Sequence, residues 1–236
     1  MVGERPRNPY GYAPSGWVAD AGAARHSLRI RKTDPKAAVD MSHNIDVPGD
    51  DPAAMHTLAM SLSQALVTHG APERPVVFAC IGTDRSTGDA LGPLVGQWLI
   101  RSGYDDSRVM GTLEYPLHAL NLRARLDPLT NAGQSPLVVA IDAALGPRGS
   151  IGIISLRSGG LRPGHGVGKS LPAIGELAIT ATVNIASGGF DAHVLQSTRL
   201  YVVQSLAKTI GIACCDAMHM TERITSMTTP EPAIAA

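Results

Sequence analysis

Five short runs of β-branched and apolar residues, separated by longer segments of helical periodicity, constrain the fold of this chain more than any other feature. The runs cover residues 75–82, 108–113, 135–142, 151–156 and 176–184. Helices are predicted over residues 90–102, 118–126 and 191–215. Strands that alternate with helices in this way form a largely parallel sheet, because parallel neighbours need a crossover connection. We therefore expect an α/β fold with helices on both faces of the sheet.

The chain divides into one central domain and flanking segments. Residues 1–50 are rich in Pro, Gly, Arg and Asp and lack periodicity, so we expect a disordered tail. Residues 51–70 are expected to form an accessory helix, with a proline in its first turn and a glycine after its end, that docks by its apolar face. We assign residues 71–217 to the α/β domain and residues 218–236 to a second disordered tail.

The charge of the chain is balanced, with 20 lysines and arginines against 20 aspartates and glutamates. Because no excess of basic residues is present, we expect no nucleic-acid partner. Three cysteines do not make a disulfide framework, and no apolar stretch approaches the roughly 18 residues of a membrane span. We expect a soluble, cytoplasmic protein without a membrane partner and without an obligatory cofactor.

Polar side chains gather where the predicted strands end. Asp84, Arg85 and Asp89 follow the first strand, Asp142 closes the third, and Asn184 closes the fifth. Ligands of open α/β sheets bind at the carboxyl ends of the strands, where these loops converge. The sequence therefore predicts one shared cleft that contains side chains from three strands.

Two aspartates in that cleft have both a structural and a chemical interpretation. Asp89 alone is typical of a helix cap and Asp142 alone of a turn. Together they suit a pair that shares one proton, with one carboxyl group as general base for water and the other as acid. The alternative is a divalent metal held by both carboxylates and His165.

Two further side chains have open roles. Arg85 is placed to lower the pKa of one carboxyl group or to bind a carbonyl or carboxylate of a substrate. His118 is either a general base or a structural residue in the first turn of a helix.

Five segments carry a resemblance to a known family. They are CIGTDRSTGDALGPLVG, GTLEYPLHALNL, AIDAALG, LRPGHGVGKSLPAIGELAITATVN and LQSTRL, which occur in this order within residues 75–210. Together they resemble the sporulation protein YyaC family. More distantly, the segments TGDALGP, AID and PGHGVG are similar to the germination protease of spores and to hydrogenase maturation proteases. This resemblance implies a three-layer α/β/α sandwich of the phosphorylase/hydrolase-like class.

The resemblance also implies a function. The aspartates proposed as catalytic in the germination protease correspond to Asp89 and Asp142, and the maturation proteases imply a metal bound with a histidine. We expect a sporulation-associated endopeptidase of the cytoplasm or forespore that acts on a protein or peptide, such as a spore protein. The alternatives are a metal-dependent peptidase and a non-catalytic protein that binds a peptide or partner. The expected substrate-binding residues are Asp84, Arg85, His118 and Asn184. YyaC-like proteins have a cysteine in the A-I-D-A-C-L-G motif where this chain has Ala144.

Overall fold

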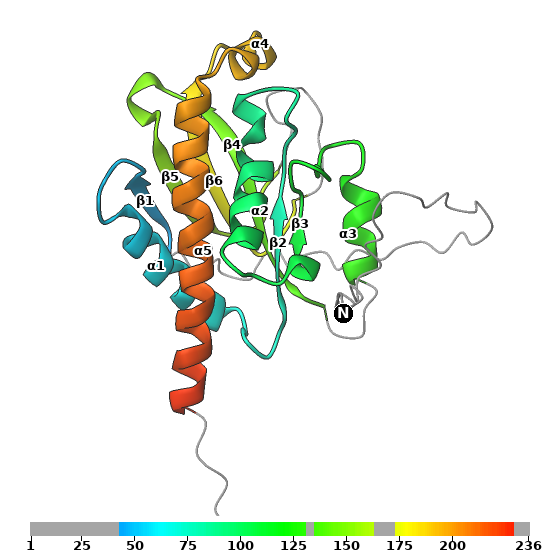
Figure 1. Ribbon diagram of the computed structural model, residues 1–236, viewed down its shortest axis with the longest axis vertical. Coiled ribbons are helices and arrows are strands. Elements are labelled where there is room, and N and C mark those ends of the chain that lie inside the picture. Colours follow the sequence, from blue (N-terminus) through cyan, green and yellow to red (C-terminus); the bar gives the residue numbers. More distant parts are fainter. Residues whose placement is uncertain (1–42, 131–134, 163–172, 229–236) are drawn as a thin grey trace, which may run out of the picture.

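A six-stranded sheet forms the centre of the part of the chain that the structure describes (Figure 1). The computed structural model describes residues 43–130, 135–162 and 173–228. The strand order is β1-β5-β6-β4-β2-β3. The strands are β1 (Ile45–Pro48), β2 (Val76–Cys80), β3 (Val109–Met110), β4 (Leu137–Gly146), β5 (Ile153–Ser158) and β6 (Leu177–Ile185).

The sheet is mixed but mostly parallel, which confirms the predicted fold class. The neighbours β6, β4, β2 and β3 run parallel to one another, whereas β5 pairs antiparallel with β6 and β1 pairs antiparallel with β5. The short segment 147–152 joins β4 to β5. Because it is short, β5 begins at the edge of the sheet where β4 ends and runs in the opposite direction. A parallel crossover would need about a dozen residues or more.

Helices of the described residues lie on both faces of the sheet (Figure 1). On one face α1 and α2 each pack along α5, and α3 lies on the other face, with α4 at the end of β6. The predicted helices at 51–70, 90–102 and 118–126 correspond to α1, α2 and α3, with ends that differ by a few residues. The bounds are α1 (Ala54–Thr68), α2 (Leu91–Arg101), α3 (Leu122–Thr130), α4 (Asp191–Gln196) and α5 (Leu200–Thr228).

Alternate residues of the central strands point to opposite faces of the sheet, as a pleated strand requires. On β2, Phe78 and Cys80 contribute to the larger core, beneath α1, α2 and α5. Ala79 lies on the other face, in a smaller cluster with Leu117 and Leu122 of the segment that includes α3. The two clusters make the described structure a three-layer α/β/α arrangement.

The expected boundary of the N-terminal tail at residue 50 is wrong. Residues 45–48 form the edge strand β1, which pairs with β5, and its Val47 side chain is buried. The Asp46 carboxylate binds the Arg157 guanidinium and accepts a hydrogen bond from the Ser155 hydroxyl, both at 2.5 Å. This short strand is stable because β5 supplies its hydrogen-bond partners. Residues 1–42 lie outside the described residues.

The expected C-terminal boundary at residue 217 is also wrong. One helix was predicted over residues 191–215, but the chain forms α4, a short break and then α5, which continues to Thr228. The helix extends because Met218 and Thr221 are buried, with Thr221 against α1. Neither α5 nor any other helix among the described residues has the length and apolar character that a bilayer crossing needs.

Candidate active site

Two backbone hydrogen bonds join the segment that contains Asp89 to the strand that contains Asp142. At the end of β2 the Ile81 amide donates to the Ile141 carbonyl (2.7 Å), directly before Asp142. The Thr83 amide then donates to the Asp89 carbonyl (3.1 Å), which closes the loop after β2. The predicted convergence of these two segments at the carboxyl edge of the sheet is therefore present.

Glycine makes the tight loop around Asp89 feasible. Gly82 has a φ of +138°, and a Cβ atom there would overlap the carbonyl oxygen of Asp89. A Cβ atom on Gly88 would lie 2.7 Å from Leu195 Cδ2 and 3.0 Å from Thr198 Oγ1, so α4 and the residues after it pack directly on this loop. The loop backbone is thus held between β2 and α4.

Asp89 is not a helix cap. It lies in the 3₁₀ turn Gly88–Ala90 that leads into α2, and neither this turn nor α2 has a side-chain hydrogen bond at its cap. The carboxyl group is half-buried instead. Burial raises its pKa, and a hydrogen bond from the Thr83 amide and the charge of His118 act in the opposite direction.

Asp142 lies inside a strand and not at its end. β4 continues to Gly146, and Asp142 is directly opposite Thr180 of β6 in the parallel register. One carboxylate oxygen, Oδ1, accepts a hydrogen bond from the Ala143 amide (2.8 Å). The predicted turn at Asp142 is therefore absent, because pairing with β6 carries the strand past it.

The two carboxyl groups interact electrostatically. Burial raises the pKa of Asp142 well above its ordinary value, the negative charge of Asp89 raises it further, and the Ala143 amide partly offsets both effects. Because ionisation of one carboxyl group opposes ionisation of the other, the pair retains a proton at a pH where exposed aspartates have lost theirs. Such a pair can supply an acid and a base together.

His118 lies next to the same loop. It follows Leu117, which forms a parallel bridge with Ile81 and accepts a hydrogen bond from the Gly82 amide (2.8 Å). The His118 ring is half-buried, and its charge lowers the pKa of Asp89. The structure thus brings three of the predicted site residues together: Asp89, Asp142 and His118.

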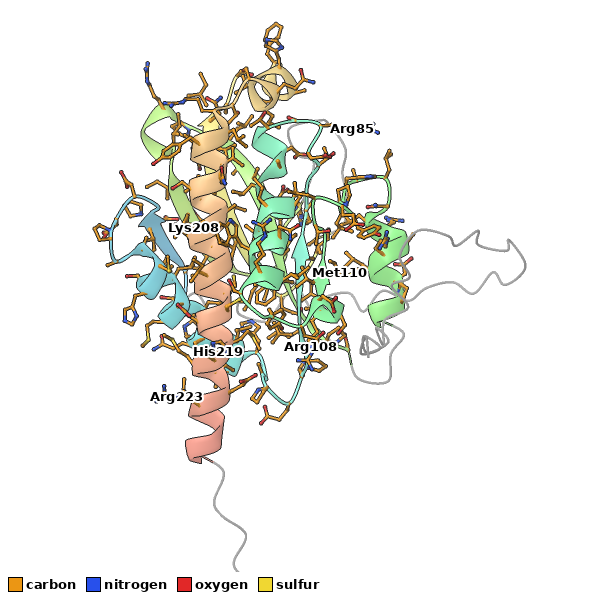
Figure 2. All side chains as sticks on the ribbon, viewed as in Figure 1. Arg85, Arg108, Met110, Lys208, His219 and Arg223 are labelled. Carbon is orange, nitrogen blue, oxygen red and sulfur yellow. The ribbon has the colours of Figure 1, made fainter. Side chains whose placement is uncertain are left out.

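Asp84 and Arg85 do not join them. Both side chains are exposed, and the Arg85 side chain points outward from the top of the molecule (Figure 2). Their local contacts are with Thr83, whose hydroxyl lies 3.5 Å from Asp84 Oδ1 and accepts a hydrogen bond from the Arg85 amide (3.3 Å). Arg85 lowers the pKa of neither carboxyl group of the pair.

Asn184 connects β6 to the segment around α4. Its Nδ2 donates to Thr198 Oγ1 (3.1 Å) and to the Val194 carbonyl (3.4 Å), and its Oδ1 accepts from the Ile185 amide (2.8 Å). The side chain is therefore engaged in holding α4 against the sheet, and α4 in turn supports the loop at Gly88.

The metal alternative depends on a residue outside the described part of the chain. His165, the expected third ligand, lies there. Among the residues that the structure describes, no three His, Cys, Asp or Glu side chains form a group able to hold a metal ion. The described residues therefore do not make up a metal site by themselves.

Comparisons with known proteins place the chain in a family. Residues 47–212 match the model of a family described as Protein of unknown function (DUF1256). The chain belongs to the DUF1256 family. It is 40% identical over 173 residues to the uncharacterized protein YyaC of Bacillus subtilis (strain 168), across 73% of this chain and 81% of YyaC. The resemblance to the YyaC family is confirmed.

The DUF1256 match begins within β1 and includes α1, so the resemblance extends further toward the N-terminus than residues 75–210. A search of solved structures found similarity to the NiFe hydrogenase maturation protease HycI from Thermococcus kodakarensis KOD1. The TM-score is 0.44 and the identity 16%, over 67% of this chain and 98% of that one.

One candidate site residue of this DUF1256 protein was not predicted from the sequence. Ser86 lies in the loop between Gly82 and Asp89, and its Oγ atom is buried without a hydrogen-bond partner among the described residues. A buried hydroxyl without a partner is costly, so an unpaired group in such a loop is a candidate contact for a ligand. Its sequence context, a serine beside Thr87 and Gly88, gave no signal because such residues are common in turns.

Proposed function

We propose that the protein is a peptidase that uses the Asp89 and Asp142 carboxyl groups as one acid–base pair. The observation that carries the proposal is the electrostatic interaction of two half-buried carboxyl groups, with raised pKa values, at the carboxyl edge of a parallel sheet. Structural carboxylates are usually paired with a cation. Neither of these carboxylates has an ion pair with a lysine or arginine of the described residues.

The chemistry requires one ionised and one protonated carboxyl group. The ionised group takes a proton from water as the water oxygen bonds to the peptide carbonyl carbon, and the protonated group donates its proton to the carbonyl oxygen. The C–N bond then breaks as the amine takes the proton that came from water and the oxygen returns its proton. Both carboxyl groups regain their starting states.

Exposed side chains support a polypeptide substrate. Large apolar side chains are exposed at the end of β6, before α4 and at the start of α5, and α4 itself packs against the loop at Gly88. Exposed apolar groups close together on a surface are typical of contacts with another polypeptide. The residues are Ile185, Phe190, Leu200 and Tyr201. A protein or peptide of the sporulating cell, such as a spore protein, is the substrate that the family resemblance suggests.

The same exposed residues favour the second candidate function, a non-catalytic protein that binds a polypeptide at this edge. In that case the carboxyl groups contact the partner and cleave nothing. The two functions differ in their dependence on proton transfer, since an amide can replace a carboxyl group in binding but not as a base.

The test is incubation of the full-length protein with small acid-soluble spore proteins, followed by intact mass measurement. Wild type is expected to yield two fragments whose masses sum to substrate plus one water. Asp89→Asn and Asp142→Asn are expected to yield none, and Asp106→Asn, an exposed carboxyl group before β3, is the control that keeps cleavage. Full cleavage by both Asn variants contradicts the proposal. Loss of wild-type cleavage after treatment with a chelator supports the metal-dependent alternative.

A further inference from the structure

We propose that the sheet face beside Asp142 binds an extended segment of polypeptide, and that the hydroxyl groups of Thr180 and Thr182 hydrogen-bond to the backbone of that segment. The inference deepens the proposed function and rests on it for the role of the bound chain as substrate. Neither threonine was predicted to belong to the site. Their placement follows from the register of β4 and β6.

Thr180 is the direct neighbour of Asp142 across the sheet. The two residues are paired in the parallel register of β4 and β6, so their side chains leave the sheet on the same face, from strands about 4.8 Å apart. This face is opposite the larger core, because the preceding residues, Ile141 and Ile179, belong to that core. Thr182 lies on the same face, two residues further along β6.

No described helix covers this part of the face. The cluster beneath α3 takes residues from β2 and β4 and none from β5 or β6. Figure 1 shows α3 beside β3, which is at the opposite end of the strand order from β5 and β1. Thr180 and Thr182 are half-buried, and neither hydroxyl group forms a hydrogen bond with another described residue. Two hydroxyl groups beside the acidic pair can therefore bind a ligand.

Small residues of β4 leave room for a backbone to approach these hydroxyl groups. Ala144 is directly opposite Thr182 in the register and presents only a methyl group. Gly146 follows it, and a Cβ atom there would lie 3.2 Å from Thr182 Cγ2. The absence of a side chain at Gly146 thus keeps the space next to Thr182 open.

An extended polypeptide matches the spacing of the two threonines. Residues on one face of a strand repeat every ~6.6–6.8 Å, and an extended chain has the same two-residue repeat. A chain that lies along β6 can thus present one backbone group to each hydroxyl. A hydroxyl group both donates and accepts, so it can bind either a carbonyl or an amide. The same chain passes Asp142, so the binding face is continuous with the proposed site of cleavage.

Charge on this face does not favour an ionic ligand. In the register across the sheet, the row that begins at Asp142 and Thr180 continues to Ser155 of β5 and Asp46 of β1. The Asp46 carboxylate is already bound by Arg157 and by the Ser155 hydroxyl. Recognition through the backbone depends little on side chains, so unfolded polypeptides of different sequence are expected to bind.

Replacement of each threonine by valine removes the hydroxyl group and keeps the β-branched shape that a strand accommodates. The matched control is Thr209→Val in α5, on the opposite side of the sheet. Thr209 is also half-buried, and its hydroxyl donates only within the helix, to the Ser205 carbonyl (3.2 Å). All three variants are expected to melt within a few degrees of wild type.

The experiment is a threonine-methyl NMR titration of the full-length Asp142→Asn protein with two probes, reduced casein and a small acid-soluble spore protein. The methyl signals of Thr180 and Thr182 are expected to shift saturably, and that of Thr209 to stay in place. Added Thr180→Val or Thr182→Val is expected to weaken binding about three- to tenfold, the effect of one lost hydrogen bond, and Thr209→Val to leave it unchanged.

Two results overturn the proposal. The first is that neither probe shifts the Thr180 and Thr182 methyl signals, or that both valine variants bind with unchanged affinity. The second is that these signals change when residues 1–42 are deleted and respond to neither probe, which would show that this segment occupies the face instead.

Cleavage is scored separately. If the probes bind through both threonines and wild type cleaves neither, the binding face stands and the peptidase proposal fails. If wild type cleaves a probe, kcat/KM is expected to fall about three- to tenfold in Thr180→Val and in Thr182→Val. Unchanged kcat/KM in both variants overturns the binding face and leaves the peptidase proposal standing.

Discussion

The hydroxyl groups of Ser63 and Thr221 lie 3.1 Å apart in the buried interface between α1 and α5. Thr221 Oγ1 also donates to the Ala217 carbonyl (2.8 Å). From the sequence, α1 was expected to be an accessory helix and residue 221 to lie in a disordered tail. The contact shows that these two segments pack against each other, which the sequence did not predict.

We predict that Thr221→Val lowers the free energy of unfolding by about 1–3 kcal/mol, since it leaves the buried Ser63 hydroxyl without this partner. The double variant Ser63→Ala/Thr221→Val is expected to lose less than the sum of the two single variants. Urea denaturation measures all four proteins. Strict additivity would show that the two hydroxyls do not interact.

The N-terminal boundary gives a second prediction. Deletion of residues 1–48 removes β1 and exposes the surface that Val47 covers. The free energy of unfolding is expected to fall by roughly 1.5–3 kcal/mol, the contribution of one large buried apolar side chain. At about 2–4 °C per kcal/mol for a chain of this size, the melting temperature falls by several degrees. Deletion of residues 1–42, which removes no described residue, is the matched comparison. Equal melting temperatures for the two deletions would show that β1 contributes nothing.

Strong local patterns predicted the main elements of the fold, and pairing with distant segments determined the rest. The apolar runs of β2, β4 and β6 and the periodicity of α1 and α2 were sufficient to predict an α/β fold. β1 was missed because four residues that end in a proline show too little alternation on their own. The strand at Asp142 was predicted too short, because Ala143 and Ala144 have no β-branched side chain to extend the pattern.

The site was predicted in part for the same reason. The rule that parallel strands present their carboxyl ends at one edge was enough to associate Asp89 with Asp142. This rule did not determine where the side chains of Asp84 and Arg85 point. Their orientation depends on the backbone at Gly82 and on the packing of α4 against Gly88. The proximity of His118 to Asp89 depends on the bridge between Ile81 and Leu117, a long-range contact without a local signal.

Gly82 gives a third prediction, since its backbone conformation is one that side chains rarely adopt. Gly82→Ala is expected to destabilise the fold by more than about 1 kcal/mol and to displace the Asp89 backbone. Gly149→Ala is the control, because a Cβ atom there meets open space and the backbone conformation is ordinary. Thermal melting compares the two variants. A Gly82→Ala protein as stable as Gly149→Ala would be incompatible with the described loop.

The raised pKa of Asp142 predicts how stability depends on pH. A carboxyl group whose pKa is higher in the folded state favours folding at low pH, and that contribution is lost as the pH rises from the ordinary value of 3.8 through the folded-state pKa. An asparagine cannot ionise, so Asp142→Asn avoids this loss of stability at higher pH. The variant is therefore expected to melt at a higher temperature than wild type at pH 7. Near pH 3 the difference is expected to disappear. A variant less stable than wild type at pH 7 would contradict this account, and Asp106→Asn, at an exposed position, is the control.

The central claim, that Asp89 and Asp142 act as one proton-sharing pair, is tested most directly by the ¹³C titration of Asp142 in wild type and in Asp89→Asn. In wild type, Asp142 is expected to lose its proton well above the ordinary pH for an aspartate, because of burial and the charge of Asp89. In Asp89→Asn the like charge is absent, so the pKa of Asp142 is expected to fall while remaining raised by burial. An Asp142 titration that is identical in the two proteins would contradict the claim.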